Sequence, residues 1–570
     1  MTAARSPFDR DQALGRMAEQ HFDVLIVGGG ITGAGVALDA AARGLRTALV
    51  EARDFASGTS SKSSKLVHGG LRYLQQKEYR LVYEALAERQ HLLDNAPYLV
   101  HPLPFLIPLF GKDGAVNKTV AKAYSTALWL YDVTGGVRIG KRHRRLTLDE
   151  TRAHFPSLRT DRLVAGFLYW DARTDDARLT LAVARTAVLD HGAVVANYAP
   201  VTELLKGTDG RVGGARIGTG IGGSAGASEG VDVRAEIVVN ATGVWADKVR
   251  ALDEGNASGT LRPAKGIHIT VPAAKLRVDM AAVVPVPKDR RSIFVVPWGD
   301  FVYLGTTDTD YSGPLENPQC TAEDVDYVLG AINAFVSEPL TRADVVGTWA
   351  GLRPLVAAAS SERTADLSRR HKVTTSPSGL VTVTGGKLTT YRRMAADTVD
   401  EVVKTIGRGA RRSPTKSLPL RGTAGADALS AGGAAGRLGV SQDVLAHLAG
   451  RYGGETRAIV AMVATDPDLG RPLVPGLPYL RAEAVYGARY EMAQTLGDVL
   501  ERRTRALLLG RDECLTVARA VADLLAPELG WSPERVALEV KSFTDEVARE
   551  RAAAGIPGMP GAAAAALADA

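Results

Sequence analysis

Residues 61–74, SKSSKLVHGGLRYL, place several proton donors beside two adjacent glycines. The imidazole of His68 can gain or lose a proton near neutral pH, and the planar guanidinium of Arg72 can hold an anion through paired hydrogen bonds. Gly69 and Gly70 leave the backbone bare, so this loop can pass close to a ligand. We therefore expect a pocket that binds an anion and moves a proton, with Tyr73 as a further polar group.

The first predicted strand of the chain leads into a glycine-rich turn. Residues 22–27 read FDVLIV, and an alanine-rich helix follows the turn. Gly28, Gly30 and Gly33 fit the pattern GxGxxG, which permits a tight turn and lets a pyrophosphate approach the backbone at a helix N-terminus. Glu51 ends the next strand, where a carboxylate can accept hydrogen bonds from a ribose diol. Together these features predict a dinucleotide site.

Two later strands also end in turns of small residues. The segment 238–247, VVNATGVWAD, contains Thr242 and Gly243, and the segment 382–392, TVTGGKLTTYR, contains Gly386. NAD needs one strand that ends in such a turn. A flavin has a further ring system whose edge must meet backbone and a helix N-terminus. Three glycine-ended strands therefore favour FAD over NAD, although each of the later turns alone is equally compatible with an ordinary loop.

The composition is that of a soluble globular protein with more than one domain. The 570 residues exceed the usual size of a domain several-fold, so two or three domains are expected. The net charge of +6 is small for this length and does not require nucleic acid as a partner. Cys320 and Cys514 have no paired spacing, which predicts neither a disulfide framework nor a metal site and fits a reducing cytosol. The first twenty residues lack the apolar core of a secretory signal, and no transmembrane helix is expected.

The spacing of apolar residues suggests the elements that position these groups. Residues 71–93 predict a long amphipathic helix, and residues 206–230 predict a hairpin with a long loop. Strand-like segments at 268–271, 292–299 and 301–309 predict a second sheet inserted into the first domain. Residues 479–510 predict one long helix of a separate helical domain.

The motifs together resemble a known family. The segments DVLIVGGGITGAGVALDAAARGL, SSKLVHGGLRYL, DDARL, NATGVWAD, GLRPL and GGKLTTYRRMA occur in the order found in FAD-dependent glycerol-3-phosphate dehydrogenase, the aerobic respiratory enzyme. The resemblance covers the chain from about residue 22 to the C-terminal helices. It implies that sn-glycerol 3-phosphate is oxidised to dihydroxyacetone phosphate and that electrons pass from FAD to a quinone. It also implies a homodimer.

The expected fold is α/β. It comprises a Rossmann-like FAD-binding domain of the glutathione-reductase/D-amino-acid-oxidase type, an inserted substrate domain with a mixed or antiparallel sheet, and a C-terminal all-helical domain. The expected boundaries are an N-terminal extension (1–20), the FAD-binding domain (21–110, 170–260 and 375–406), the substrate-binding domain (111–169 and 261–374), a linker (407–435), the helical domain (436–551) and a flexible tail (552–570).

A substrate phosphate must be held by several cations or amides. Paired hydrogen bonds from arginine suit this task better than a single lysine. By resemblance, Arg72 and Arg353 face the substrate, Tyr73 and Thr306 add polar contacts, and Lys387 lies over the reduced flavin and contacts substrate. Without the resemblance, Arg353 would be better explained as part of a structural ion pair.

Oxidation of a secondary alcohol also requires a base for the hydroxyl proton. His68 and His268 occur in segments that resemble the family, and we favour His268 as the base with His68 as an orienting group, while the reverse assignment stays open. The catalytic candidates are thus His268, Arg353, Lys387 and His68. The cofactor-binding candidates, with Ser60, Ser64 and Lys65 expected near the phosphates and ribitol, are Gly28, Gly30, Ile31, Thr32, Gly33, Glu51, Ser60, Ser64, Lys65, Leu66, Val201, Thr242, Gly243, Gly386, Leu388 and Thr389.

A quinone acceptor lies in the bilayer, so this function predicts a peripheral contact with the inner face of the cell membrane. The apolar segments 103–111 and 123–135 and the basic segment 140–145 are candidates for that surface. Three alternatives remain open at this stage: a glycerol-3-phosphate oxidase that uses oxygen, an amino-acid or sarcosine-type flavin oxidase, and a flavin-binding sensor without catalysis.

Overall fold

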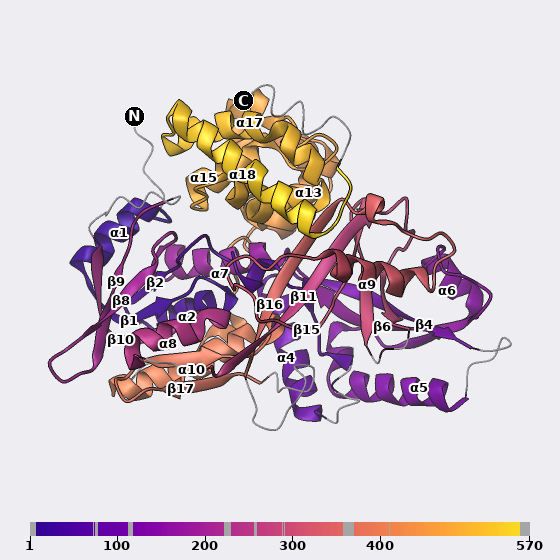
Figure 1. The fold of residues 1–570 in the computed structure, drawn as a ribbon, viewed down its shortest axis with the longest axis horizontal. Helices are drawn as coiled ribbons and strands as arrows, with labels where there is room; N and C mark the ends of the chain where they lie inside the picture. The colour runs from indigo at the N-terminus through magenta and orange to yellow at the C-terminus, as the bar shows by residue number, and fades with distance from the viewer. Residues whose placement is uncertain are drawn as a thin grey trace.

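Two β-sheets lie side by side, and a bundle of helices from the end of the chain covers their junction (Figure 1). The computed structural model describes residues 7–71, 73, 78–111, 118–221, 230–255, 259–287, 289, 291–356, 370–407, 409 and 411–558. Within these residues, no helix combines the length and apolar character needed to cross a bilayer.

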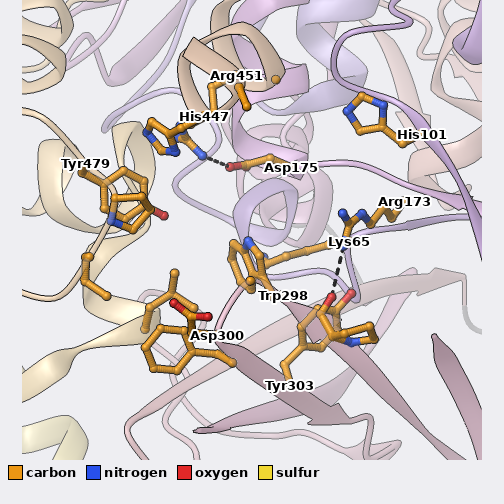
Figure 2. A pocket seen from close by; sticks show the side chains of 18 of the residues that line it. Lys65, His101, Arg173, Asp175, Trp298, Asp300, Tyr303, His447, Arg451 and Tyr479 are labelled. Atoms are coloured by element: carbon orange, nitrogen blue, oxygen red, sulfur yellow. Dashed lines mark hydrogen bonds and ion pairs between the residues drawn. The ribbon is translucent and has the colours of Figure 1, made fainter. Parts of the chain in front are cut away.

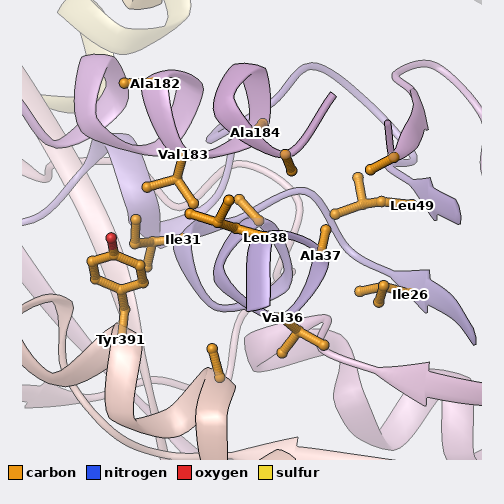
Figure 3. Close-up of a cluster of buried hydrophobic side chains, with 14 of the residues drawn as sticks. Ile26, Ile31, Val36, Ala37, Leu38, Leu49, Ala182, Val183, Ala184 and Tyr391 are labelled. Carbon is orange, nitrogen blue, oxygen red and sulfur yellow. The ribbon is translucent and has the colours of Figure 1, made fainter. Parts of the chain in front are cut away.

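The first sheet carries the predicted dinucleotide turn. Helix α2 follows strand β1 directly and packs between α7 and α10, where Ile26, Leu38 and Val183 are buried (Figure 3). A Cβ atom at Gly35 would lie 2.8 Å from the ring of Tyr391, so this glycine allows α2 and α10 to approach closely. The parallel strands are β18 (Val381–Thr384), β10 (Val231–Asn240), β1 (His21–Val27), β2 (Thr47–Val50) and β7 (Val194–Ala196); β17 (Lys372–Thr375) and the hairpin β8 (Val201–Lys206) and β9 (Val212–Ile217) extend the sheet, and its helices are α1 (Arg10–Glu19), α2 (Ile31–Ala42), α7 (Asp176–Leu189), α8 (Ala246–Glu254) and α10 (Tyr391–Ile406).

The second sheet is mostly antiparallel, as expected for the inserted sheet. Its long strands β11 and β16 pair over ten residue positions, and this register places His268 opposite Trp349 and Ala264 opposite Arg353. The strands are β15 (Thr309–Asp310), β11 (Leu261–Pro272), β14 (Phe301–Gly305), β13 (Ser292–Trp298), β12 (Ala281–Pro285), β4 (His101–Phe110), β6 (Leu163–Arg173), β3 (Leu66–Val67), β16 (Gly347–Val356) and β5 (Arg144–Leu146); the neighbouring helices are α4 (Tyr79–Asn95), α5 (Lys118–Val133), α6 (Leu148–His154) and α9 (Ala322–Asn333).

One segment considered for membrane contact lies inside this sheet. Residues 103–110 belong to β4, which pairs with β6 along its length, and Phe105, Leu106 and Leu109 are buried. The expectation that this segment contributes to an exposed apolar surface is therefore wrong. Its prolines do not interrupt the strand, because Pro104 and Pro108 take regular positions in the ladder with β6. The predicted helix over 71–93 is described as α4 from Tyr79 onward, whereas residues 74–77 lie outside the described part of the chain.

The C-terminal part is helical, but the predicted single helix over 479–510 is wrong. Met492 and Arg505 have positive φ values of 53° and 72°, and a π-helical turn lies between them. Such values break a right-handed helix, and the segment between the two breaks buries the charged side chains of Asp498, Arg502 and Arg503. The helices are α11 (Asp427–Ser430), α12 (Ala434–Leu438), α13 (Gln442–Tyr452), α14 (Thr456–Thr465), α15 (Arg481–Tyr490), α16 (Ala506–Leu509), α17 (Arg511–Leu529) and α18 (Pro533–Ala553).

Buried ion pairs join this helical part to the first sheet. Asp54, just after β2, is fully buried and accepts hydrogen bonds from Arg502 Nε at 2.6 Å and from Arg503 Nη1 at 2.7 Å. Arg505 pairs with Asp176 at the start of α7, and both side chains are fully buried. Removing one partner of such a pair leaves an uncompensated charge away from water.

Asp54→Asn is therefore expected to destabilise the protein by about 3 kcal/mol, because the buried Arg503 keeps only Glu491, at 3.8 Å, and Arg502 loses one of its three carboxylate partners. The melting temperature of the flavin-loaded protein should fall by at least about 5 °C. Asp161→Asn is the matched control, since Asp161 pairs with Arg159 on the surface and such pairs contribute at most about 1 kcal/mol. Equal melting temperatures for the two variants would show that the Asp54 pairs do not hold the parts together.

Candidate active site

A cavity of about 390 Å³ lies at the carboxyl ends of the parallel strands of the first sheet. The ends of β1, β2, β10 and β18 all contribute to it, which is the edge where open α/β sheets bind ligands. Eleven of the predicted cofactor-binding residues line this cavity: Gly28, Gly30, Ile31, Thr32, Glu51, Ser60, Val201, Thr242, Gly243, Gly386 and Leu388.

The glycine turn has the geometry that a bound pyrophosphate needs. Gly28 has φ of +111°, and a Cβ atom there would lie 2.7 Å from the carbonyl oxygen of Ala241. At Gly33 a Cβ atom would lie 1.8 Å from Gly28 O, so α2 can begin this close to the turn only with glycine. The N-cap of α2 is Gly30, which supplies no capping side chain. The backbone amides of the first turn of α2 therefore form a cradle suited to the phosphates of a dinucleotide.

Glu51 lines the cavity and also holds the turn in place. Its Oε2 accepts a hydrogen bond from Gly29 N at 2.6 Å, and its Oε1 accepts one from Arg53 N at 2.9 Å. Burial raises the pKa of Glu51 above its ordinary value. Each carboxylate oxygen has a second lone pair, so the bonds to the turn are compatible with the predicted hydrogen bonds to a ribose diol.

Five predicted cofactor-binding residues lie elsewhere. Gly33 packs beneath the turn, and Leu66 is buried in β3. Thr389 accepts a hydrogen bond from His68 N at 3.1 Å, which ties β3 to the turn after β18. Ser64 Oγ lies 2.9 Å from His268 Nε2, and Lys65 lines a different cavity, where its Nζ lies 3.1 Å from Asp176 Oδ1.

Arg353 lies on the second sheet beside three successive residues that follow β14. Its Nη2 donates to Thr306 Oγ1 and to Thr307 O, both at 3.1 Å, and its Nη1 donates to Asp308 Oδ1 at 3.1 Å. A Cβ atom at Gly266 would lie 2.5 Å from Arg353 Nη2, so this glycine leaves the room that the guanidinium occupies. The predicted pair of Arg353 and Thr306 is thus in contact. Arg353 also forms the ion pair that the sequence alone suggested for it, and Asp308 is the partner that the sequence did not identify.

His268 is buried at the centre of this group. Its ring stacks on Trp349 with centroids 4.8 Å apart and an interplanar angle of 9°. Burial, and then the positive charges of Lys65 and Arg353, lower the pKa of His268 well below its ordinary value. Nδ1 is buried and forms no hydrogen bond to any residue that the structure describes. Because Nδ1 of this neutral imidazole has no hydrogen-bond partner among the described residues, it can accept a proton from a bound molecule.

Lys387 and Tyr73 approach the same region from the first sheet and the loop after β3. Lys387 Nζ lies 3.7 Å from the ring centroid of Tyr73, and Lys387 lines the cavity together with Pro354, the residue after Arg353. A Cβ atom at Gly70 would lie 2.3 Å from the Tyr73 ring, which explains a glycine there. Among the predicted site residues, Arg72 lies outside the described part of the chain.

Trp349 is the neighbour of His268 that sequence reasoning missed. It lies four residues before Arg353 on β16, and residues separated by two or four positions share one face of a strand. That alternation could have placed Trp349 beside Arg353. Its stacking on His268 depends on the register between β11 and β16, which the local sequence does not reveal.

The low pKa of His268 has a consequence for stability. In the unfolded chain a histidine gains a proton below about pH 6.5, whereas buried His268 stays neutral to lower pH. Acid therefore lowers the free energy of unfolding, by up to about 1.4 kcal/mol per pH unit. His268→Asn removes this group. We therefore expect the melting temperature of the parent protein to fall more steeply than that of His268→Asn between pH 6.5 and 5. His21→Asn, at an exposed position, is the control, and parallel curves for the parent and His268→Asn would contradict a neutral His268.

Comparison with known proteins agrees with this arrangement. A family model described as "FAD dependent oxidoreductase" matches residues 23–392, and one described as "C-terminal domain of alpha-glycerophosphate oxidase" matches residues 413–536. Glycerol-3-phosphate dehydrogenase 2 of Mycobacterium tuberculosis is 42% identical over 554 residues, which cover 96% of this chain and 92% of that protein. The mitochondrial glycerol-3-phosphate dehydrogenase of Homo sapiens is 38% identical over 541 residues, which cover 92% of this chain and 73% of that protein.

A solved structure is similar over nearly the whole chain. It is the glycerol-3-phosphate dehydrogenase from Bacillus halodurans complexed with FAD, with a TM-score of 0.77 and 32% identity, covering 97% of this chain and 99% of that one. These similarities confirm the predicted fold class and the choice of FAD as cofactor. The chain therefore belongs to the glycerol-3-phosphate dehydrogenase family of FAD-dependent oxidoreductases.

Proposed function

We propose that this protein oxidises sn-glycerol 3-phosphate to dihydroxyacetone phosphate with FAD and passes the electrons to a membrane quinone. The observation that carries the proposal is that Arg353, Thr306 and a neutral, buried His268 lie together on the second sheet, next to Pro354, which lines the cavity together with Lys387. An anion-binding group next to a proton acceptor is what a phosphorylated alcohol requires. The relatives named above are called dehydrogenases, which favours an acceptor other than oxygen.

The cofactor has a site that fits it. The glycine turn and the first turn of α2 would hold the pyrophosphate, Glu51 the ribose, and the turns at Thr242 and Gly386 the ring system. FAD, when bound, supplies the acceptor for the hydride that leaves C2 of the alcohol.

The remaining steps fall to the side chains. Arg353 and Lys387, with Thr306 and Tyr73, hold and orient the phosphate and hydroxyl groups of the substrate, and Arg72 is assigned the same role by resemblance. His268 receives the hydroxyl proton, and Ser64 Oγ, 2.9 Å from its Nε2, holds the ring so that Nδ1 is the accepting atom. His68, whose backbone is fixed by Thr389, orients the loop against the ring system.

The first test is anaerobic. Adding glycerol 3-phosphate to the yellow protein should bleach its visible absorption, whereas glycerol, which lacks the phosphate, should not. His268→Asn is expected to slow this reduction by a factor of about 10² to 10⁴ with the oxidised spectrum unchanged, since a proton acceptor is lost. His68→Asn should slow it far less, and the reverse result would make His68 the base. Absence of bleaching in the parent would contradict the proposed substrate.

The same assay tests the anion site. Arg353→Met should raise the KM for glycerol 3-phosphate by about 10- to 100-fold, because charge-assisted hydrogen bonds to a phosphate are lost. Arg353→Lys should recover part of the affinity.

Mixing the reduced protein with oxygen or with a soluble quinone then separates the acceptors, and fast oxidation by oxygen with negligible oxidation by quinone would make the protein an oxidase.

We also propose that the protein is a homodimer, on the resemblance alone, and that it contacts the membrane surface. The contact is assigned to α4 and α5. Trp129 and Val133 on α5 are 60% and 62% exposed, and Tyr79 and Tyr83 on α4 are also exposed. The guanidinium of Arg138 lies 5.1 Å from the Tyr83 ring. Exposed aromatic side chains beside cations are typical of surfaces that enter the headgroup region of an anionic bilayer.

Trp129→Glu is expected to reduce flotation with anionic liposomes at least tenfold, because a charge replaces an aromatic group at the membrane surface. Replacing Arg142, Arg144 and Arg145 by Gln should weaken flotation further and make it less sensitive to salt. Leu538→Glu is the control, since Leu538 is similarly exposed but lies on α18. Unchanged flotation of Trp129→Glu would show that α5 does not contact lipid.

A further inference from the structure

A second cavity, of about 880 Å³, lies between the C-terminal helices and the second sheet (Figure 2). It is lined by α13, by residues 476–479, by the end of β6 and by the turn between β13 and β14. None of its lining residues lines the cavity at the glycine turn. Its volume is in the range of cavities that hold small molecules.

One side of this cavity carries a positive charge without a carboxylate partner. Arg173, at the end of β6, donates from Nη1 to Pro297 O at 3.1 Å, and no ion pair joins it to a carboxylate in the described part of the chain. His101 lies opposite Arg173 in the register of β4 and β6, and burial and the neighbouring guanidinium lower the pKa of His101. The histidine thus stays neutral beside Arg173 at neutral pH, and the guanidinium gives this side of the cavity its positive charge. The exposed carboxylate of Asp300 lies on a different side of the cavity (Figure 2).

Other parts of the wall offer aromatic contact, alongside Asp175, which is paired with Arg451, and the exposed Asp300. Trp298 and Phe301 come from the strands on either side of the β13–β14 turn, and Tyr479 comes from the segment before α15. Figure 2 shows Trp298 and Tyr479 facing the cavity from different elements, with Arg173 and His101 on another side. A molecule that combines an acidic group with an aromatic or apolar body would satisfy both kinds of wall.

The cavity is linked to His268 through three consecutive residues. Lys65 lines the cavity, and the residue before it, Ser64, places Oγ 2.9 Å from His268 Nε2. Tyr303, also in the cavity wall, donates from Oη to Ser64 O at 2.9 Å. Ser63 O accepts a hydrogen bond at 3.1 Å from the indole of Trp349, on which His268 stacks. A ligand that moves Lys65 or Tyr303 must therefore also act on the serine that positions His268.

We propose that this cavity binds an organic anion from solution, with its acidic group on Arg173 and its body against Trp298 and Tyr479, and that occupancy changes the rate of catalysis through Ser64 and His268. The C-terminal helices that line the cavity lie at the opposite end of the molecule from α5 in Figure 1, so the ligand is assigned to solution rather than to a bilayer. The binding itself is independent of the proposed function, whereas the effect on turnover depends on it.

The binding experiment uses the complete flavin-loaded protein and 2-naphthalenesulfonate as the probe, measured by titration calorimetry. Dihydroxyacetone phosphate is present at saturation to keep the site around Arg353 filled. We expect one saturable site whose Kd rises at least tenfold in Arg173→Gln and partly recovers in Arg173→Lys. Arg159→Gln, which removes a surface arginine, should leave Kd within twofold of the parent value. Absence of a saturable site, or an equal Kd in the parent and Arg173→Gln, would overturn the proposal.

The turnover experiment separates this cavity from the substrate site. At saturating 2-naphthalenesulfonate, kcat of the parent should change at least twofold with KM for glycerol 3-phosphate unchanged, and Arg173→Gln should show neither effect while keeping its turnover without the probe. An unchanged kcat would overturn the link to His268. A rise in KM alone would show that the probe competes at Arg353, which would also overturn it. If the parent protein does not oxidise glycerol 3-phosphate at all, the proposed function fails, and the Kd comparison still decides the binding site.

Discussion

The fold depends on the pairing of buried carboxylates, after β2 and at the start of α7, with arginines of the C-terminal part. Taking these charges out of water costs free energy that only close, complete pairing offsets. Asp176 is shared between Arg505 and Lys65, and Ser61 O accepts hydrogen bonds from both Lys65 Nζ at 3.0 Å and Arg505 Nη2 at 3.2 Å. The two buried cations thus fix the backbone of the loop that leads to β3. A looser arrangement would leave at least one charge without its partner.

That loop serves several regions because its backbone is fixed. Ser60 Oγ accepts a hydrogen bond from Ile31 N at the start of α2, and Ser64 Oγ lies next to His268 on the second sheet. After these two serines, Lys65 lines the second cavity, and His68 is joined to the turn after β18. Residues 60–68 contain many hydrogen-bonding side chains because successive side chains contact different elements. The positive φ of 55° at Lys65 marks the point where the chain turns between them.

Local rules were enough to predict some of these features and not others. The turn at Gly28 and Gly33 follows from glycine spacing after a buried strand, and the structure shows the close contacts that the spacing implies. The contact between His268 and Trp349 joins residues far apart in the sequence and depends on strand register. The breaks near Met492 and Arg505 oppose the helical pattern, because burying Arg502, Arg503 and Arg505 beside partners in another part of the chain outweighs local helix propensity. Sequence spacing contains no information about those partners.

The electrostatics of His268 couple the binding of the substrate phosphate to the removal of the hydroxyl proton in the proposed reaction. In the protein alone, burial and then the positive charges of Lys65 and Arg353 oppose a charged imidazole, so His268 is a poor proton acceptor. A phosphate dianion bound at Arg353 offsets that positive potential and makes the protonated imidazole less unfavourable. The phosphate takes no part in the oxidation itself. Its binding would nevertheless raise the basicity of His268, which receives the proton. In such a site the phosphate serves catalysis as well as recognition, because its effect on His268 is felt in the step that moves the proton.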